Sequence, residues 1–561
     1  MHIKLRIFLL FCIGTVLTAF GGDSDILRKY TEDVPFDMPS ITEPQFPDFS
    51  VNISDFGAVG DGHTINTKAI ADAIEKCLNN GGGTVLVPQG IWLTGPVQLK
   101  SNINLHLREG AVLLFSPHFE DYPLIKSTWE GRNEIRCIAP ISGFNLENIA
   151  ITGKGIIDGS GDAWRPVKKF KMTDRQWDQL VASGGAINAK GNTWWPSEAA
   201  MNGAALIREL SKDPSIDIKE YAAAREYLRP VMVNLVNCKR VLLDGPTFQN
   251  SPAWNIHPLM CENMIIRNIN VRNPWYSQNG DGIDLESCRN VILYHSRFDV
   301  GDDAICLKSG RDELGRRRGK PTENVVIDGC TVYHGHGGFT VGSEMSGGVR
   351  NISVSNCTFL GTDVGLRFKS TRGRGGVVEN IYISNIFMKD IPTEAVRFNM
   401  FYDNSPPIPE NENDKSLPYL NRPIAPVSEE TPQFRNIEMK NIYCRGAKQA
   451  VLLQGLPEMT LSNLKIDNLI MSAKKGLVCV DTEDLVLKNI HITTEKGPVI
   501  ACYNSKKIDI DNIYTSNING PLVTINGDKT GKIKIRQVNG LPDKNLVDIG
   551  DEVSPEVISW Q

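Results

Sequence analysis

Residues 263–293 have the sequence NMIIRNINVRNPWYSQNGDGIDLESCRNVIL, and this stretch decides the fold. It begins and ends with one pattern, an asparagine followed by three apolar residues: Asn263-Met-Ile-Ile and Asn290-Val-Ile-Leu. Val and Ile favour a strand, and asparagine favours a turn. No helical pattern fills the interval between the two triplets, which disfavours a doubly wound sheet with crossover helices.

The same pattern recurs along most of the chain. Asn324 and Asn351 are 27 residues apart, as are Asn263 and Asn290. Short strands at a regular interval, each flanked by Gly, Asn or Asp, are typical of a solenoid. The sequence therefore predicts an all-β chain folded as a right-handed parallel β-helix. The residues that precede the triplets are Asn148, Arg240, Asn263, Asn290, Asn324, Asn351, Asn380, Asn436, Asn463, Lys507 and Lys532.

Three segments interrupt the repeat. Residues 66–78 have apolar side chains at helical spacing, which predicts a helix that caps the N-terminal end of the coils. Residues 164–230 contain helix signals and four tryptophans, which predicts a partly helical insertion. Residues 403–432 contain seven prolines, which predicts an extended loop.

The first residues have the pattern of an export signal. Lys4 and Arg6 precede the apolar run 7–16, and small residues follow it at 19 and 21. We expect residues 1–21 to be a signal peptide and the protein to be exported, to the periplasm or the cell exterior. No later segment is long and apolar enough to predict a membrane span. The rest divides into an N-terminal extension at 22–50, the β-helix domain at 51–545 and a C-terminal tail at 546–561.

Composition excludes several classes of protein. The 561 residues are 41% hydrophobic, which fits a globular chain, and their net charge of −5 argues against a nucleic-acid partner. Beyond Cys12 the cysteines are odd in number and lack a C-x-x-C pair, so neither a zinc site nor a disulfide framework is predicted. Six recur with the coils, and we expect them as buried free thiols: Cys238, Cys261, Cys288, Cys306, Cys330 and Cys357.

Carboxylates gather in two consecutive repeats. Asn279-Gly-Asp281 stands in one turn, and Gly301-Asp302-Asp303 stands at the same phase of the next. Adjacent parallel strands lie about 4.8 Å apart, so these carboxylates are expected to form one cluster in which one pKa is raised. A single Asp-Gly pair is usually an ordinary turn, but two in register favour a site.

The next repeats add cations. Gly335-His336-Gly337 and Arg367-Phe-Lys369 follow in order, and six basic residues lie between Lys308 and Lys320. On a chain of negative net charge, such a cluster favours a ligand with carboxylate groups, because Arg and Lys pair with them. The alternative is a solvated surface of salt bridges.

These motifs together resemble family 28 of the glycoside hydrolases, the polygalacturonases and their relatives. The ordered set covers the chain from about residue 50 to 530, and it consists of Asp55–Gly62, Ser251–Pro258, Asn279–Asp281, Gly301–Asp303, Gly335–Gly337 and Arg367–Lys369. The resemblance implies a right-handed parallel β-helix that hydrolyses α-linked galacturonic acid in pectin, without metal or other cofactor, and with inversion at the anomeric carbon.

The resemblance also implies roles for single residues. Asp302 is expected as the general acid, Asp281 and Asp303 as the groups that activate water, and His336 as a support for the acid. The expected substrate-binding residues are Asn279, Arg367, Lys369, Tyr402, His257 and Lys308. Gly280 departs from the threonine that is usual in endo-acting members. Carboxylates this close favour retention by the general separation rule, whereas the resemblance implies inversion.

Other readings remain open. A rhamnogalacturonan or xylogalacturonan hydrolase would share the motifs, and a pectate lyase or a non-catalytic β-helix carbohydrate binder would share the repeat. Within the family, the long insertion at 164–230 and the loop at 403–432 favour exo action, because both leave the coils near the carboxylates and would close one end of a cleft. The alternative is an insertion that only packs on the flank for stability or dimerisation.

Overall fold

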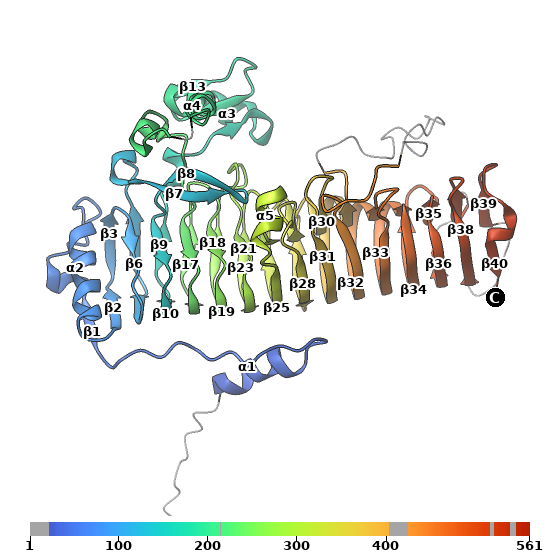
Figure 1. Cartoon of the computed structure of the whole chain (residues 1–561), viewed down its shortest axis with the longest axis horizontal. Coiled ribbons are helices and arrows are strands. Elements are labelled where there is room, and N and C mark those ends of the chain that lie inside the picture. Colours follow the sequence, from blue (N-terminus) through green and yellow to red (C-terminus); the bar gives the residue numbers. More distant parts are fainter. Residues whose placement is uncertain (1–21, 214, 403–423, 516–520, 539–545, 561) are drawn as a thin grey trace, which may run out of the picture.

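The structure is a computed structural model that describes residues 22–213, 215–402, 424–515, 521–538 and 546–560. The described residues form a parallel β-helix, as predicted, with 35 strands in one continuous sheet that winds through three faces (Figure 1). The predicted signal peptide lies outside the described residues. No helix in the described part of the chain has the length and apolar character needed to cross a membrane.

The predicted triplets all lie in one face, here called the triplet face. Its strands pair in parallel from coil to coil. They are β1 (Ser50–Asn52), β2 (Gly83–Val87), β5 (Ile103–Leu107), β10 (Glu147–Gly153), β16 (Lys239–Asp244), β19 (Glu262–Arg267), β22 (Arg289–Tyr294), β25 (Thr322–Asp328), β28 (Val349–Ser355), the first parts of β31 (Val377–Asn399), β32 (Gln433–Gln454) and β33 (Leu461–Val480), and β34 (Thr482–Thr494), β36 (Lys506–Tyr514), β38 (Gly531–Val538) and β40 (Ile558–Trp560).

A second face, the site face, holds the candidate functional residues. It consists of β4 (Val97–Gln98), β9 (Ile141–Phe144), β15 (Val233–Val236), β18 (Ile256–Leu259), β21 (Ile283–Glu286), β24 (Ile305–Lys308), β27 (Gly337–Val341), β30 (Val364–Lys369), the last parts of β31, β32 and β33, and β35 (Ile500–Tyr503), β37 (Val523–Asn526) and β39 (Val547–Ile549). The third face consists of β3 (Gly90–Thr94), β6 (Ala111–Phe115), β11 (Ile156–Asp158), β17 (Thr247–Gln249), β20 (Asn270–Arg272), β23 (Arg297–Asp299), β26 (Thr331–Val332), β29 (Thr358–Leu360), the middle parts of β31, β32 and β33, and the last parts of β34, β36 and β38.

The repeated asparagine has a physical reason. Asn290, Asn324 and Asn351 each have φ 56°, a left-handed conformation that asparagine tolerates better than most residues. Their side chains also form a ladder: Nδ2 of Asn324 donates to Oδ1 of Asn290 at 3.1 Å, and Asn351 donates to Asn324 at 3.0 Å. Each coil is thereby held in register with the one before it.

The interior of the coils is apolar throughout. Inward side chains such as Val325 and Ile327 are fully buried, and Phe368 stacks on Phe398 with ring centroids 4.1 Å apart. The six cysteines predicted as buried free thiols are all free and buried, which confirms that prediction. Five of them fill core positions as small apolar side chains, whereas Cys306 is buried on the outward side of β24, in register with Asp284 and Thr340.

The two ends of the stack are closed differently. Helix α2 (Thr67–Leu78) covers the N-terminal end and buries Ile70, Ala73 and Ile74, as expected for residues 66–78. At the other end, the segment predicted as a tail contains β39 and β40, which pair with β37 and β38. The sheet therefore extends past residue 545, and these strands were missed because they lack the asparagine turn.

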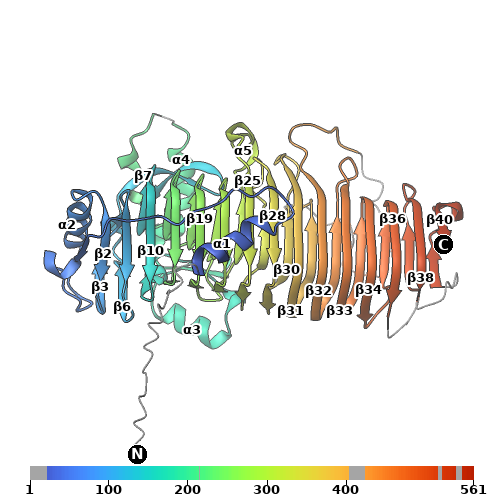
Figure 2. The ribbon, with the colours of Figure 1, turned by 90° about the horizontal axis from the view of Figure 1, so that it is seen from below.

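The N-terminal extension runs along the outside of the coils. It contains α1 (Gly22–Glu32), and Figure 2 shows that helix and the following chain lying across the strands. Leu27 and Tyr30 are buried there, and the Tyr30 hydroxyl donates to Asp328 at 3.1 Å. The extension thus covers apolar side chains on the outside of the triplet face.

Two additions rise on the opposite side of the stack from α1 (Figure 1). One is the predicted insertion, with α3 (Asp174–Ala182), α4 (Glu198–Leu210) and a small sheet of β12 (Val167–Lys168), β13 (Ala186–Ile187) and β14 (Thr193–Trp195). Thr173 and Gln176 form a capping box at the start of α3, in agreement with the helix signals predicted there. The other is a hairpin, β7 (Leu124–Trp129) and β8 (Arg132–Cys137), which the sequence analysis missed. A last helix, α5 (Asp312–Arg318), follows β24.

Candidate active site

Three carboxylates meet at the N-terminal ends of two neighbouring strands of the site face. Asp281 precedes β21, and Asp302 and Asp303 precede β24, which pairs with β21 in parallel. One oxygen of each lies within 4.8 Å of the others. The structure therefore brings together the carboxylates that the sequence placed in register.

The turn before Asp281 explains the departure at Gly280. A Cβ atom added at Gly280 would overlap the side chain of Ser277, and one at Gly301 would also meet Ser277. Both glycines are thus needed for the close approach of two turns. A threonine at position 280 fits only if Ser277 moves.

Asp303 is held by three donors. Arg367 Nη1 lies 2.9 Å from its Oδ1, Lys369 Nζ lies 2.7 Å from its Oδ2, and the Thr340 hydroxyl donates to Oδ1 at 3.1 Å. Burial alone would raise the pKa of Asp303, but the two cations hold it well below its usual range. Asp303 is therefore ionised and fixed in orientation.

Asp302 and Asp281 have opposite pKa shifts. His336 Nδ1 lies 3.1 Å from Asp302 Oδ1, and this contact lowers the pKa of Asp302 although burial acts against it. Burial raises the pKa of Asp281 well above its usual value, and the charges of Asp302 and Asp284 add to that effect. The expected raised pKa is present, but it belongs to Asp281 and not to the expected acid, Asp302.

The remaining predicted residues fall into two groups. Asn279 and Tyr402 lie beside the site: Asn279 Oδ1 accepts from Arg229 at 2.9 Å, and the Tyr402 ring lies 4.9 Å from Lys369 Nζ. His257 and Lys308 are instead buried: His257 Nε2 lies 2.9 Å from Glu286 Oε2, within hydrogen-bond distance, and Lys308 forms an ion pair with Glu344 at 3.0 Å.

This second group lies deeper than expected for substrate-binding residues. The side chains of His257 and Lys308 are 1% and 4% exposed. Both point outward from the sheet but are covered, and the Lys308 ammonium packs on Trp254 at 4.7 Å from the ring centroid. Lys308 also lies 3.6 Å from Asp284, beneath the carboxylate cluster, and a role of either residue in substrate binding stays a prediction.

The insertion supplies residues that the sequence analysis did not single out. Lys171 Nζ donates to the Gly301 carbonyl at 3.0 Å and lies 3.3 Å from His336 Nε2. Arg229, at the far end of the insertion, donates to Asn279 and to the Gln278 carbonyl. Neither residue belongs to the repeat, so nothing in the coil spacing points to them.

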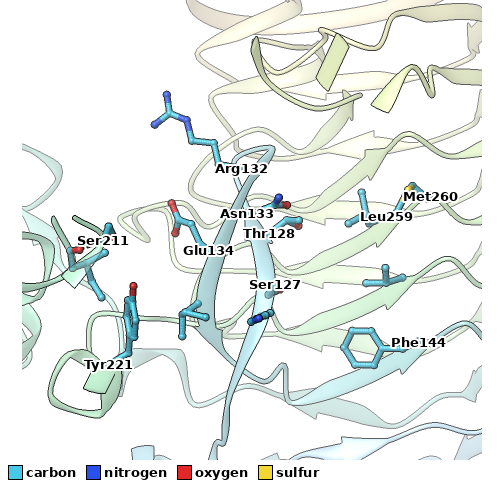
Figure 3. A pocket seen from close by; sticks show the side chains of 14 residues that line it. Ser127, Thr128, Arg132, Asn133, Glu134, Phe144, Ser211, Tyr221, Leu259 and Met260 are labelled. Carbon is cyan, nitrogen blue, oxygen red and sulfur yellow. Dashed lines mark hydrogen bonds between the residues drawn. The ribbon is translucent and has the colours of Figure 1, made fainter. Parts of the chain in front are cut away.

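Two other features bear on ligands. The carboxylates of Asp281, Asp302 and Asp303 are close enough to share a cation, but Arg367 and Lys369 already supply positive charge to Asp303. Separately, a groove of about 770 Å³ lies where the hairpin crosses the C-terminal ends of β9, β15 and β18 (Figure 3). Phe144, Leu259 and Met260 line it, so it lies at the opposite strand ends from the carboxylates.

The fold and the site together define a class of protein. A parallel β-helix that stacks three carboxylates, a histidine, an arginine and a lysine on consecutive coils is typical of an enzyme that acts on an acidic polysaccharide. The comparisons with known proteins agree. Residues 166–417 match the family model for glycosyl hydrolases family 28, and residues 50–106 match the model described as rhamnogalacturonase A/epimerase, pectate lyase-like.

Individual relatives extend the match over most of the chain. A probable polygalacturonase from Vitis vinifera is 29% identical over 451 residues, with 78% of each chain covered. The exo-poly-alpha-D-galacturonosidase of Dickeya chrysanthemi is 30% identical over 361 residues, which cover 63% of this chain and 57% of that protein. A hyperthermoactive exopolygalacturonase from Thermotoga maritima matches with a TM-score of 0.65 and 32% identity, covering 80% of this chain and 91% of that one. The chain belongs to family 28 of the glycosyl hydrolases.

Proposed function

We propose that this glycoside hydrolase cleaves α-1,4-linked galacturonic acid in pectin and that it acts from a chain end. The observation that supports the substrate class most directly is the pair Arg367 and Lys369 beside the carboxylate cluster. Guanidinium and ammonium groups at this position fit the carboxylate of a galacturonate unit. Relatives named as polygalacturonases support the same substrate.

Asp302 is the proposed proton donor to the glycosidic oxygen. Its side chain is 17% exposed, whereas Asp281 and Asp303 are buried. Among the described residues, the Asp303 backbone N–H and His336 both contact Oδ1 of this carboxylate. Oδ2 is therefore the oxygen available to the ligand. Asp281 and Asp303 would orient and deprotonate the attacking water.

We propose that Asp302 receives its proton from Asp281. In the free protein the raised pKa places it on Asp281, and the two carboxylates lie within 4.8 Å. An acidic substrate brings negative charge and excludes water, and both effects raise the pKa of Asp302. Substrate binding would thus favour the protonated form of Asp302.

Inversion at the anomeric carbon remains a proposal drawn from the family. The separation of the carboxylates would by itself favour retention, because inverting enzymes usually hold them about 6.5 to 9.5 Å apart. NMR of the first product formed, before mutarotation, tests the point. Inversion predicts the β-anomer, and the α-anomer would refute it.

Exo action is supported by the insertion and by the relatives. Lys171 and Arg229 anchor the insertion directly on the site, so it is placed to close one end of the cleft. Two relatives are named as exo-acting galacturonosidases. We also propose that the protein is exported, on the basis of the signal pattern at residues 1–21.

A panel of polysaccharides tests the substrate. The proposal predicts release of small products from homogalacturonan and little from rhamnogalacturonan or xylogalacturonan. The match of residues 50–106 to the rhamnogalacturonase A/epimerase, pectate lyase-like model makes rhamnogalacturonan the alternative to include. Cleavage of rhamnogalacturonan alone would overturn the proposal, and an ultraviolet-absorbing unsaturated product would show a lyase.

A further inference from the structure

Lys171 lies at the centre of the site although it belongs to the insertion. It is the last residue of a short turn of helix, η4 (Lys169–Lys171), and only 8% of its surface is exposed. Its ammonium donates to the carbonyl of Gly301, the residue before Asp302, and faces Nε2 of His336. The contact joins residues 165 positions apart in the sequence.

The contact determines which nitrogen of His336 carries the proton. An ammonium group has donors and no acceptor, so the ring nitrogen that faces it at 3.3 Å must accept. The proton of the neutral ring then resides on Nδ1, which donates to Oδ1 of Asp302 at 3.1 Å. A second proton on Nε2 would point at the ammonium.

The other charged group near the ring acts in the opposite direction. Asp363 Oδ2 lies 3.7 Å from His336 Nε2, and its side chain is 54% exposed. Burial lowers the pKa of Lys171, while the carboxylates of Asp302, Asp363 and Asp281 favour its charged form and Lys168 opposes it. The closer and more buried partner of Nε2 is the lysine.

We infer that Lys171 is a positioning residue that fixes the tautomer of His336 and thereby the orientation and protonation of Asp302. The inference deepens the proposed function, because it assigns the insertion a part in the chemistry as well as in closing the cleft. Without the ammonium, Nε2 becomes free to take up a proton and pair with Asp363. An imidazolium beside Asp302 would stabilise the ionised carboxylate and disfavour the acid form.

The test compares Lys171→Met with Lys171→Arg, and with Lys169→Met as a control from the same segment. Lys169 packs on the Trp177 ring and does not belong to the site. On a galacturonate oligosaccharide, Lys171→Met should lower kcat by about tenfold or more, which is less than the roughly 100-fold expected for loss of the acid itself, because Lys171 acts only through His336. It should also move the alkaline limb of the kcat/KM profile to lower pH. Lys171→Arg should keep kcat and the alkaline limb closer to the wild-type values than Lys171→Met does. Lys169→Met should change neither kcat nor the pH profile.

A second readout needs no substrate. NMR of protein labelled with ¹⁵N-histidine, with His336→Gln to assign the signals, reports which ring nitrogen is protonated. We expect the Nδ1–H form in the wild type and a protonated Nε2 in Lys171→Met. An identical ring state in both proteins would overturn the inference, as would a rise in KM with an unchanged kcat and pH profile, which would show a substrate contact. If the wild type does not cleave polygalacturonate, the proposed function fails while the NMR result still decides the role of Lys171.

Discussion

Asp281, Asp302 and Asp303 have the same side chain, and their surroundings give each a different state. Lys369 and Arg367 lower the pKa of Asp303, and His336 lowers that of Asp302. Burial raises the pKa of Asp281. Environments that separate the pKa values of neighbouring carboxylates are what acid and base catalysis requires. The assignment of roles can be tested one residue at a time.

Asp302→Asn should lower kcat by at least about 100-fold, because it removes a transferable proton at nearly constant volume. Substrate binding and the melting temperature should change little. Steady-state kinetics and a binding measurement with a non-hydrolysed oligosaccharide check both parts. A variant that retains more than about a tenth of the activity would show that Asp302 is not the acid.

Arg367→Ala and Lys369→Ala test the recognition of the substrate carboxylate. Each should weaken binding of unesterified pectin by about tenfold or more, the size expected for a charge-assisted hydrogen bond. Methyl-esterified substrate lacks the charge and should be affected much less. Both residues also hold Asp303, so an equal loss on the two substrates would mean that support of Asp303 is their whole role.

Asp284 provides a test of pH-dependent stability. It is fully buried on the site face with Lys308 Nζ 3.6 Å away, and burial raises its pKa to about 8. The folded protein therefore keeps a proton that the unfolded chain loses between about pH 4 and pH 8, so this group makes stability fall as pH rises through that window.

Asp284→Asn cannot lose this proton. The melting temperature of the variant, relative to the wild type, should therefore increase from pH 4 to pH 8. Asp72→Asn, on the exposed face of α2, serves as a control that should show no such trend. A difference in melting temperature that does not vary with pH would contradict the assigned state of Asp284.

At the scale of elements, the asparagine ladder links the sequence repeat to stability. Asn324→Ala removes hydrogen bonds to Asn290 and Asn351 and places alanine at a φ of 56°. The free energy of unfolding should fall by about 2 kcal/mol or more. Asn324→Gly should lower the free energy of unfolding less, since glycine tolerates the conformation. Lys532→Ala, at the equivalent turn of a later coil but outside the ladder, should lower it least of the three. Equal melting temperatures for the alanine and glycine variants would show that φ is unimportant here.

Some elements of the structure could be predicted from the sequence and others could not. The triplets and the motif residues from Asp281 to Lys369 follow from a repeat, because each coil obeys the same spacing and turn chemistry. Helix α2 follows instead from apolar residues at helical spacing. The hairpin β7–β8, Lys171 and Arg229 do not, since their positions depend on how long insertions fold back onto the coils. The burial of His257 and Lys308 could not be predicted for a similar reason: a strand pattern shows that a side chain points outward but not what covers it.

At the scale of the whole molecule, the insertion makes the two ends of the site unequal. It rises from the N-terminal half of the β-helix on the side opposite α1, and it contacts the site through Lys171 and Arg229 (Figure 1). A polymer that must lie across several coils needs both ends open, whereas a closed end selects chain termini. The geometry of the insertion therefore supports cleavage from one end.

Time-resolved product analysis on polygalacturonate, with viscosity followed in the same reaction, tests this central claim most directly. The account predicts that monomer or dimer accumulates from the start while the remaining polymer stays long and the viscosity falls slowly. An early ladder of mid-length oligomers with a rapid loss of viscosity would contradict it.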